Sequence, residues 1–564
     1  MLLLSLLLSL LAGALATAKP ALTSFQLQRS VPSLPLGLFR HLRSLETSSL
    51  QDVSSHADQL TFSVPSPSSL YTAHTFDQLV SHDPNVPAPS EHATFKQRYW
   101  FDATYYRPGG PVLLLDGGET DGEGRLPFLK EGILQILSQA TGGIGVLFEH
   151  RYYGKSFPVD NLTTDSFRYL TTMQSLQDSA HFAKNVVFPG LEDKELTSPH
   201  AAWLYYGGSY AGAKAAFARK LFPEVWWGVI ASSAVTAAII DFWEYYEPIR
   251  ISAPPACSSL LINHTSVIDE LLAFSNPLVT SSLKSFFGLP NITLDTDFVN
   301  ALHIPLGSWQ GRNWDDSVGS NEFFNFCDAI TEGLEEEHTS EASILVRAIR
   351  NIFPSFPSDP RKAFASFSAY AGYVKENIAS MCPKGVAQDD CFGTDVYEGD
   401  DLSEAPWKSW SYQFCTGESF LASFAPEGHP SLVSSLITPG YTGQICRKAF
   451  PDGELNRVPA QPNVTEINQW GSLELSYPRL AFIDGSEDPW LYATPHSPNA
   501  KNPKRKDTLK RPFKLIPGGV HHWDENGRLD GDVPTAILAV HEDEIHFVQA
   551  WMKEWREKGQ WKAE

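Results

Sequence analysis

The pattern of apolar and polar positions divides much of the chain into short apolar runs separated by stretches of helical period. Each run has four or five mostly apolar residues and lies next to glycine, proline or charged residues, which is typical of buried parallel strands. A single run of this kind could also be part of a buried helix, so the prediction rests on their repetition. The runs are residues 111–115, 144–148, 202–206, 227–231, 480–483 and 513–516.

Helical patterns alternate with these runs. Residues 129–140 and 210–221 have apolar positions at helical spacing, and so does the C-terminal stretch 533–558. Strand followed by helix, repeated along the chain, predicts an α/β fold with a parallel sheet covered by helices. We expect residues 533–558 to pack on that sheet.

The middle of the chain, residues 241–465, is richer in helical periodicity, as in residues 344–349. The six cysteines also fall there, whereas the flanking parts have none. This asymmetry predicts a mostly helical cap, stapled by disulfides and inserted into a cysteine-free domain. The expected organisation is a signal peptide at 1–18, an N-terminal tail or pro-segment at 19–70, the first domain part at 71–240, the cap at 241–465 and the second domain part at 466–564. The cysteines are Cys257, Cys327, Cys382, Cys391, Cys415 and Cys446.

Three features predict that the protein enters the secretory pathway. The apolar N-terminus ends in Ala16-Thr17-Ala18, which is typical of a signal peptide cleaved before Lys19, although it has no basic n-region. An even number of cysteines predicts three disulfides, with fifteen possible pairings. We therefore expect an extracellular protein, or one in a vacuolar or lysosomal compartment. Four N-glycosylation acceptors agree with this, namely Asn161, Asn263, Asn291 and Asn463.

Composition excludes several classes of partner. The chain has 564 residues, 42% of them hydrophobic, which is enough apolar material for a large core. Its formal net charge of −22 argues against nucleic acid as a partner. Beyond the N-terminus no segment approaches the length of a membrane span. His541 and His546 resemble a zinc motif but are five residues apart rather than four, so we expect a solvated helix face, no metal and no cofactor.

The segment around Ser209 carries the strongest chemical motif. It follows a predicted strand and opens a predicted helix, which is the context of a nucleophile elbow. Gly207 and Gly212 provide the small neighbours that such a sharp turn needs, although Ala211 stands where the usual motif has glycine. The backbone N–H of Tyr210 would face the reacting carbonyl. The alternative is a glycine-rich turn with an idle serine.

A serine nucleophile needs a histidine base held by a carboxylate, and in α/β-hydrolases these follow the serine in the order acid, then histidine. The loop after residues 480–483 offers Asp484, Glu487 and Asp488. The loop after residues 513–516 offers His521 and His522. Both loops follow the carboxyl ends of predicted strands, where such sheets bind ligands. The residues alone leave the choice within each loop open.

The oxyanion hole needs a second backbone N–H besides that of Tyr210. The loop after the first strand, Gly117-Gly118-Glu119, is placed to provide it, and we expect Gly118 to be the donor. His150 also follows a predicted strand, but it precedes the serine, so we expect a structural role for it.

Several motifs together resemble one family of serine peptidases, that of lysosomal Pro-X carboxypeptidase, dipeptidyl peptidase II and the fungal acid prolyl endopeptidases. The resemblance covers about residues 75–555. It implies an α/β-hydrolase domain with a helical cap between serine and acid, and hydrolysis on the carboxyl side of proline at acidic pH. The motifs are Gly207-Gly-Ser-Tyr-Ala-Gly212, Glu149-His-Arg-Tyr-Tyr-Gly154, Thr94-Phe-Lys-Gln-Arg-Tyr99, Asp488-Pro-Trp490 and Gly518-Gly-Val-His521.

Carried over residue by residue, the resemblance implies a catalytic triad of Ser209, Asp488 and His521. Trp490 would pack against a proline ring, with ordinary core packing as the alternative. Asp484 departs from the family pattern, in which asparagine is common. The resemblance and the clustering in the cap also favour three disulfide pairs, namely Cys257–Cys327, Cys382–Cys391 and Cys415–Cys446.

The resemblance leaves the mode of cleavage open. The polar segment between acid and histidine, residues 501–511, is similar to that of the fungal endopeptidases, which favours an endopeptidase acting on proline-containing peptides. A Pro-X carboxypeptidase or dipeptidyl peptidase is the alternative, followed by a lipase or carboxylesterase of the same fold. A catalytically dead relative is disfavoured because no triad member is missing. Activity below neutral pH requires a neutral base where a free histidine is mostly protonated.

Overall fold

The computed structural model describes residues 70–90, 93–332, 340–352, 360–394, 399–418, 420–528 and 531–558. The predicted signal peptide and all but the last residue of the predicted N-terminal segment lie outside the described residues.

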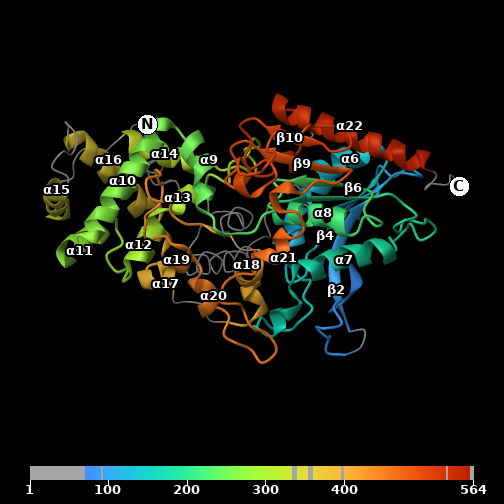
Figure 1. Cartoon of the computed structure of the whole chain (residues 1–564), viewed down its shortest axis with the longest axis horizontal. Coiled ribbons are helices and arrows are strands. Elements are labelled where there is room, and N and C mark those ends of the chain that lie inside the picture. The colour runs from blue at the N-terminus through green and yellow to red at the C-terminus, as the bar shows by residue number, and fades with distance from the viewer. Residues whose placement is uncertain are drawn as a thin grey trace, which may run out of the picture.

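A single eight-stranded sheet forms the centre of one half of the molecule (Figure 1). Its strand order is β1-β2-β4-β3-β5-β6-β9-β10. The five pairings from β4 to β10 are parallel, whereas β1–β2 and β2–β4 are antiparallel. The strands are β1 (His74–Leu79), β2 (Thr94–Asp102), β3 (Val112–Asp116), β4 (Ile144–Phe148), β5 (Trp203–Gly208), β6 (Gly228–Ser232), β9 (Leu480–Gly485) and β10 (Phe513–Ile516).

The six apolar runs of the sequence form β3, β4, β5, β6, β9 and β10, so the predicted parallel sheet is confirmed. The antiparallel edge made by β1 and β2 was not predicted. β1 alternates exposed and half-buried positions and has no continuous apolar run. A search for continuous apolar runs finds strands that are buried on both faces. It misses an edge strand such as β1, which has one face exposed to solvent.

Helices cover both faces of the sheet, as in other α/β folds. Helices α7 (Thr172–Asn185) and α8 (Tyr210–Leu221) bury their apolar side chains against one face. Helices α6 (Ile133–Thr141) and α22 (Thr535–Glu557) do so on the other face, where α22 runs along the edge of the view (Figure 1). The helix predicted at 129–140 is interrupted at Gly132, where the short α5 (Pro127–Lys130) ends and α6 begins. A Cβ at Gly132 would lie 2.7 Å from the Glu525 carbonyl oxygen, so this approach requires glycine.

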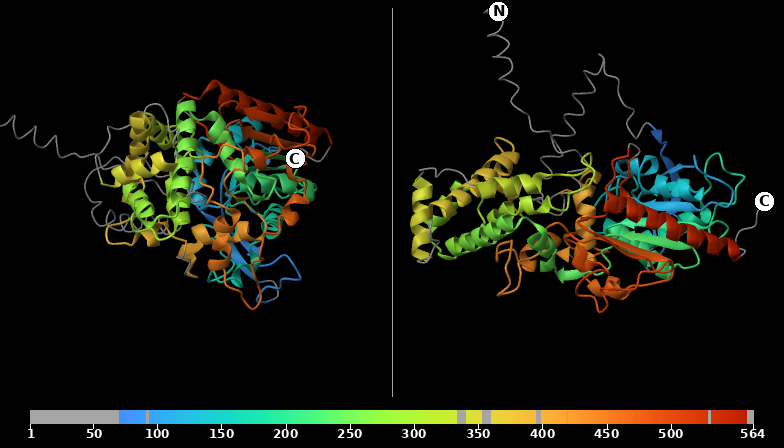
Figure 2. Two further views of the ribbon diagram at one scale, coloured as in Figure 1. Left: turned by 60° about the vertical axis from the view of Figure 1, so that its left-hand side comes forward. Right: turned by 90° about the horizontal axis from the view of Figure 1, so that it is seen from above.

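The region between β6 and β9, residues 233–479, is called the inserted region below. It is mostly helical, and its longer helices lie beside the sheet half (Figures 1 and 2). A two-stranded parallel sheet of β7 (Ile239–Asp241) and β8 (Phe420–Leu421) lies in the same region. Its α-helices are α9 (Glu247–Ser252), α10 (Pro255–Ala273), α11 (Pro277–Phe286), α12 (Asp295–Leu302), α13 (Ile304–Gly307), α14 (Glu322–Glu332), α15 (Ser340–Ile352), α16 (Pro360–Asn377), α17 (Gln388–Phe392), α18 (Ala405–Thr416), α19 (Pro439–Thr442), α20 (Gln444–Lys448) and α21 (Val464–Asn468).

The inserted region packs in two different ways. Helices α10 to α17 pack around one apolar core, which contains Trp309 and Phe367 and extends to Trp490 and Val520 of the sheet half. Helices α18 and α20 instead pack on the sheet half, where Tyr412 stacks on Phe167 with ring centroids 4.8 Å apart. The chain therefore has an α/β-hydrolase fold with a large insertion. Helices α10 to α17 of this insertion form a helical cap, and helices α18 and α20 pack on the sheet half.

Three disulfides lie in the inserted region, and they are the pairs that the resemblance favoured. Cys257–Cys327 joins α10 to α14, and Cys382–Cys391 closes the short segment before α17. Cys415–Cys446 joins α18 to α20. Two disulfides therefore lie in the part that contains α10 to α17, and the third lies in the part that contains α18 and α20.

Two further expectations concern the surface. The four asparagines of the predicted glycosylation sites are exposed, as glycan attachment requires, and their modification stays a prediction. The solvated face expected for His541 to His546 is only partly present: Glu542 and His546 are exposed, but His541 and Glu544 are buried, and His541 contacts the Asp524 carbonyl. No described helix is both long and apolar enough to cross a membrane.

Candidate active site

Ser209 lies in the sharp turn between β5 and α8, as the motif predicts. Its backbone has φ 60° and ψ −125°, an unusual conformation for a residue other than glycine. The turn is crowded. A Cβ at Gly207 would lie 2.1 Å from the Ala211 carbonyl oxygen, and one at Gly212 would lie 2.6 Å from that of Ser232. These glycines let β5 and α8 approach closely. The chain therefore makes a sharp turn at Ser209, and the serine hydroxyl faces the cavity.

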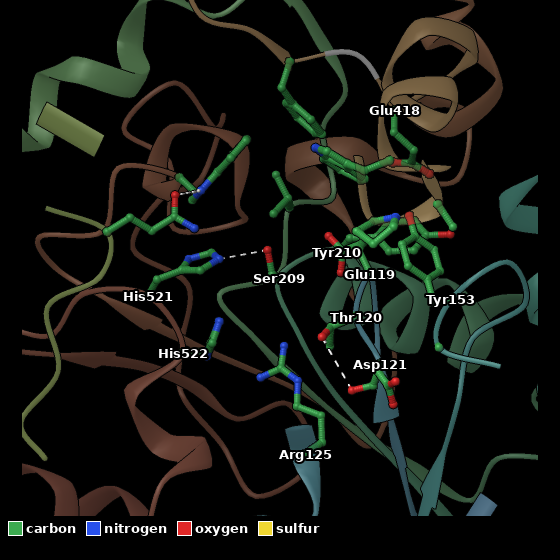
Figure 3. Close-up of a pocket in the computed structure, with 18 of the residues that line it drawn as sticks. Glu119, Thr120, Asp121, Arg125, Tyr153, Ser209, Tyr210, Glu418, His521 and His522 are labelled. Atoms are coloured by element: carbon green, nitrogen blue, oxygen red, sulfur yellow. Dashed lines mark hydrogen bonds between the residues drawn. The ribbon is translucent and has the colours of Figure 1, made fainter. Parts of the chain in front are cut away.

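His521 and Asp488 reach Ser209 from the loops after β10 and β9. His521 Nε2 lies 2.8 Å from Ser209 Oγ. The other ring nitrogen, Nδ1, lies 2.8 Å and 3.1 Å from the two carboxylate oxygens of Asp488. Asp488 is completely buried, and its Oδ1 also accepts the backbone N–H of Trp490 at 2.9 Å. The three side chains form one continuous chain of hydrogen bonds from a buried carboxylate to a half-buried hydroxyl. Figure 3 shows its last step, from His521 to Ser209.

The competing acids in the β9 loop have other partners. Asp484 lies 2.6 Å from His496 Nδ1, and this pair is buried. Glu487 accepts from the guanidinium of Arg312 at 2.9 Å. The geometry brings only Asp488, of the three candidate acids, to the histidine that contacts Ser209.

The second histidine, His522, faces away from the serine hydroxyl. Its backbone N–H donates to Ser233 Oγ at 2.8 Å, and its Nδ1 lies 2.9 Å from Glu525. Its backbone is in the left-handed region, at φ 41°. His522 therefore turns the chain and lines the cavity beside His521.

The loop after β3 is held by a buried ion pair. Asp116 accepts from Lys214 Nζ and from the Tyr205 hydroxyl, each at 2.6 Å. Burial alone would raise the pKa of Asp116, but the Lys214 ammonium outweighs it and holds that pKa below its usual range. The other Asp116 oxygen accepts the Gly118 N–H at 2.9 Å.

This contact corrects the expectation that Gly118 provides the second oxyanion donor, because its N–H is already bound. The next residue, Glu119, lines the cavity together with Ser209 and Tyr210, but its own carboxylate accepts from its backbone N–H. Tyr210 begins α8, so its N–H has no acceptor earlier in the helix. Of the two expected donors, only Tyr210 stays a candidate.

His150 has the structural role that the sequence predicted. Its ring is buried, with Nδ1 2.7 Å from the Arg151 carbonyl and Nε2 3.2 Å from the Tyr210 hydroxyl. Burial lowers the pKa of His150 to about 3, and the nearby Lys214 adds to this. The ring therefore stays neutral and contacts the Tyr210 hydroxyl through Nε2. Among the described residues no group of three or more histidine, cysteine or acidic side chains could hold a metal.

Ser209 and His521 open into a cavity of about 170 Å³ (Figure 3). The sheet half supplies the reactive groups and the loop after β3. The inserted region supplies most of the other walls, which include Trp410 and Phe420. The remaining lining residues are Thr120, Asp121, Arg125, Tyr153, Gly154, Val235, Gln310, Leu402, Ala405, Pro406, Glu418, Trp490 and His522.

Trp490 packs in the core and also lines the cavity, and its contact with a proline ring stays a prediction. Its ring packs against Phe242, Tyr245 and Phe420, with centroids between 5.1 and 5.6 Å away. It is 7% exposed, and the exposed part lines the cavity. Its Nε1 donates to Gln310 Oε1 at 2.9 Å, which ties the acid loop to the inserted region.

Two carboxyl groups in the cavity are held partly or fully neutral near neutral pH. Burial raises the pKa of Glu119 to about 7, against the lowering effects of Arg125 and His521. Burial raises the pKa of Glu418 to about 8, and the charge of Glu119 adds to this. Glu418 also accepts from the Thr172 hydroxyl at 2.5 Å.

Sequence reasoning missed Arg125, Gln310, Trp410 and Glu418 as cavity residues. None lies in a motif, and Gln310, Trp410 and Glu418 lie more than 60 residues from any predicted catalytic residue. A sequence signal exists only for Arg125, which follows closely on the predicted oxyanion loop.

Comparisons with known proteins agree with this geometry. Residues 87–273 match the family model described as "Serine carboxypeptidase S28". The chain is 38% identical over 501 residues to a protein of Arthroderma benhamiae named "Probable extracellular serine carboxypeptidase", covering 86% of this chain and 68% of that one. It is 28% identical over 484 residues to serine protease vicPa of Bipolaris victoriae, with 84% and 88% covered. It is 25% identical over 482 residues to the thymus-specific serine protease of Mus musculus, with 82% and 85% covered.

The resemblance seen in the motifs is therefore confirmed over most of the chain. The protein belongs to the serine carboxypeptidase S28 family and is a hydrolase of the serine peptidase type.

Proposed function

We propose that this protein is a secreted serine peptidase that hydrolyses peptide bonds on the carboxyl side of proline, with Ser209, His521 and Asp488 as its catalytic triad. The observation that carries the proposal is the continuous hydrogen-bonded chain from Asp488 through His521 to Ser209. It lies at the carboxyl edge of a parallel sheet in a member of a serine peptidase family.

In the proposed reaction Ser209 Oγ attacks the carbonyl carbon of the scissile bond while His521 Nε2 takes the hydroxyl proton. The backbone N–H of Tyr210 stabilises the oxyanion. His521 then gives the proton to the leaving amine, the C–N bond breaks, and an acyl-enzyme remains. Water attacks the ester, its proton passes to His521, and the Ser209 hydroxyl is restored. Asp488 keeps Nδ1–H oriented and stabilises the imidazolium.

The walls of the cavity support a preference for proline. Proline has no N–H and a fixed φ, so it suits an apolar pocket better than a groove that pairs with backbone N–H groups. Val235, Trp410, Phe420 and Trp490 offer such a surface next to Ser209. The family resemblance supports the same specificity. Secretion is supported by the N-terminal signal pattern and by the extracellular relative.

The triad is tested by substitution. Ser209→Ala, His521→Gln and Asp488→Asn should each lower kcat by roughly 10³-fold or more, because the three act as a unit. His522→Gln is the matched control and should keep substantial activity, because His522 does not contact the serine. Full turnover in His521→Gln with loss in His522→Gln would reverse the assignment of the base.

The specificity is tested by digestion of a long peptide with one internal proline, read by mass spectrometry. A single cut after the proline supports the proposal. Hydrolysis of simple esters with no cut in the peptide would overturn it and favour the lipase or carboxylesterase alternative. Blocking both ends of the peptide separates an endopeptidase, which the sequence favours, from an exopeptidase.

A further inference from the structure

A strongly basic surface segment, residues 501–511, lies between β9 and β10 in the sequence and is called the basic segment below. It contains six lysine or arginine residues and one acid, in a chain whose formal net charge is −22, so the rest of the chain is more acidic still. Nothing in the proposed reaction uses this charge. All of its cationic side chains except that of Arg505 are exposed, namely Lys501, Lys504, Lys506, Lys510 and Arg511.

The basic segment is held against the sheet half through its backbone and through Arg505. The half-buried Arg505 guanidinium donates to two backbone carbonyls within residues 473–475. The Lys510 carbonyl accepts the backbone N–H of Arg479 at 2.7 Å. One arginine of the segment therefore anchors it, and the exposed lysine side chains extend from a backbone that is fixed in place.

The acids near the basic segment do not neutralise its exposed cations. Asp507, the acid within the segment, pairs with Lys514 of β10 at 2.7 Å. Glu474 accepts the backbone N–H of Lys501 at 2.6 Å. In the part of the chain that the structure describes, none of the five exposed cationic side chains forms an ion pair. A group of like charges in this state attracts polyanions, most strongly at low ionic strength.

The basic segment and the catalytic cavity lie at opposite edges of the sheet. Arg511 lies two residues before β10 begins, and Arg479 directly precedes β9. The carbonyls that bind Arg505 also precede β9. From there the two parallel strands run to the loops that contain Asp488 and His521. A ligand of the basic segment therefore has no need to enter the cavity.

We propose that the basic segment binds an anionic polysaccharide and holds the secreted enzyme on it while the cavity stays open to peptides. This inference goes beyond the proposed peptidase activity and relies only on the proposed secretion. Lysine is a hydrated point charge on a flexible stem, so a set of lysines suits a flexible chain of repeated carboxylate or sulfate groups. Each contact releases counterions from such a polymer. The acidity of the rest of the chain repels the polymer elsewhere and restricts binding to this segment.

Membranes and nucleic acids are the competing polyanions. Leu509 is 47% exposed in the same segment and would give an anionic membrane one apolar contact. Anionic lipids are concentrated in the cytoplasmic leaflet, however, which a secreted protein does not meet. Proteins that bind single-stranded nucleic acid add aromatic side chains that stack on bases, and residues 501–511 contain none. A secreted protein meets anionic polysaccharides instead.

The test measures binding of the whole protein to immobilised dextran sulfate and polygalacturonate, with neutral dextran as the blank. At about 50 mM salt both charged polymers should bind, and log affinity should fall against log salt with a slope of about −3, as expected for about four or five contacts. Binding to dextran sulfate alone supports a sulfated partner, and binding to both supports recognition by charge. Binding to neither charged polymer, or equal binding to neutral dextran, overturns the inference.

Variants locate the effect. A quadruple variant of the basic segment should lose ~100-fold or more in affinity, because each lost contact lowers it several-fold. The matched control removes the same charge from four exposed lysines elsewhere and should bind like the wild type. Equal losses in both variants would mean that net charge rather than this segment controls binding, which overturns the inference. The test variant combines Lys501→Gln, Lys504→Gln, Lys506→Gln and Lys510→Gln, and the control combines Lys96→Gln, Lys184→Gln, Lys384→Gln and Lys553→Gln.

Hydrolysis and competing ligands complete the test. The kcat/KM for a short prolyl peptide should be the same with and without polymer, and in both quadruple variants, because the basic segment lies away from the cavity. Competitive inhibition of the wild type by the polymer would place its binding surface at the cavity and overturn the inference. Tighter binding to anionic phospholipid vesicles or single-stranded DNA than to either polymer, at equal charge concentration, would also overturn it. Polymer binding without hydrolysis of prolyl peptides would support this inference while the proposed function fails.

Discussion

The sheet half and the inserted region both line the cavity, but each holds its residues in place by different means. In the sheet half the reactive groups sit in turns at strand ends, and Gly207 and Gly212 leave no space for a Cβ. In the inserted region Trp410, Phe420 and Glu418 come from helices and short segments. Two apolar cores, each shared with the sheet half, and three disulfides hold this region in place. Backbone geometry thus controls the position of Ser209, the proposed nucleophile, whereas side-chain packing controls the position of the cavity walls.

This difference indicates how the two parts can vary. A turn without space for a methyl group tolerates almost no change, because the neighbouring atoms belong to the backbone. A wall made of packed side chains can change its shape while the helices stay in place. We therefore expect chemistry to depend on the sheet half and selectivity to depend on the inserted region.

The largest expected effect is at the elbow. Gly207→Ala places a methyl group 2.1 Å from a backbone oxygen, so the turn must open and displace Ser209. We expect kcat to fall by ~100-fold or more, or the protein not to fold, as measured by turnover per folded enzyme and by thermal unfolding. Gly440→Ala in α19 is the control, because its nearest neighbour would be a side-chain oxygen 3.6 Å away. Wild-type turnover in Gly207→Ala would remove the contrast between the two regions.

The disulfides test the inserted region, where we expect a loss of stability without a loss of turnover. Replacing Cys257 and Cys327 together by alanine should lower the free energy of unfolding by about 4 kcal/mol, because the bond closes a separation of 70 residues. Removing Cys382–Cys391, which spans 9 residues, should cost about 3 kcal/mol. Denaturant unfolding measures both. Turnover at 25 °C should persist in each double variant, and its loss would show that these staples also position the catalytic groups.

A smaller effect is expected from Glu544 in α22. Burial raises the pKa of Glu544 well above its ordinary value, and neither carboxyl oxygen has a hydrogen-bond partner among the described residues. The unfolded chain releases this proton near pH 4.3, so the folded state loses stability as the pH rises above that value.

Glu544→Gln should therefore lose less thermal stability than the wild type between about pH 5 and pH 8. Glu542→Gln, at an exposed position two residues earlier, is the control. Buried histidines such as His150 change stability in the opposite direction below about pH 6.5, but they contribute equally to all three proteins. Parallel Tm curves for Glu544→Gln and the wild type would contradict the prediction.

The smallest effect is expected where the two regions touch. Trp490→Phe keeps the aromatic ring but loses the hydrogen bond to Gln310. We expect kcat/KM for a prolyl peptide to fall by ~3- to 10-fold, the value of one hydrogen bond. Gln310→Leu should have a similar effect, and the double variant should add little to either change. Additive losses would mean that the two residues act independently and that this contact does not connect the regions.

The sequence by itself determined the parallel strands, the elbow and the place of the insertion, because each depends on neighbouring residues. Apolar runs show strands buried on both faces, and the glycines around Ser209 show a turn that leaves no room for side chains. The same reasoning missed β1 and β2, because polar residues interrupt their apolar runs, and some of these, such as Gln78, Gln97 and Arg98, are buried.

Only the tertiary structure decided which acid and histidine meet the serine. Asp484 and Asp488 are equivalent as sequence, and they differ because one lies against His496 and the other against His521. Gly118 is excluded as an oxyanion donor by Asp116, which a strand-end position cannot reveal. Gln310 lines the cavity from the inserted region and binds Trp490, which the sequence cannot reveal because hydrogen bonds between distant segments depend on how the chain packs.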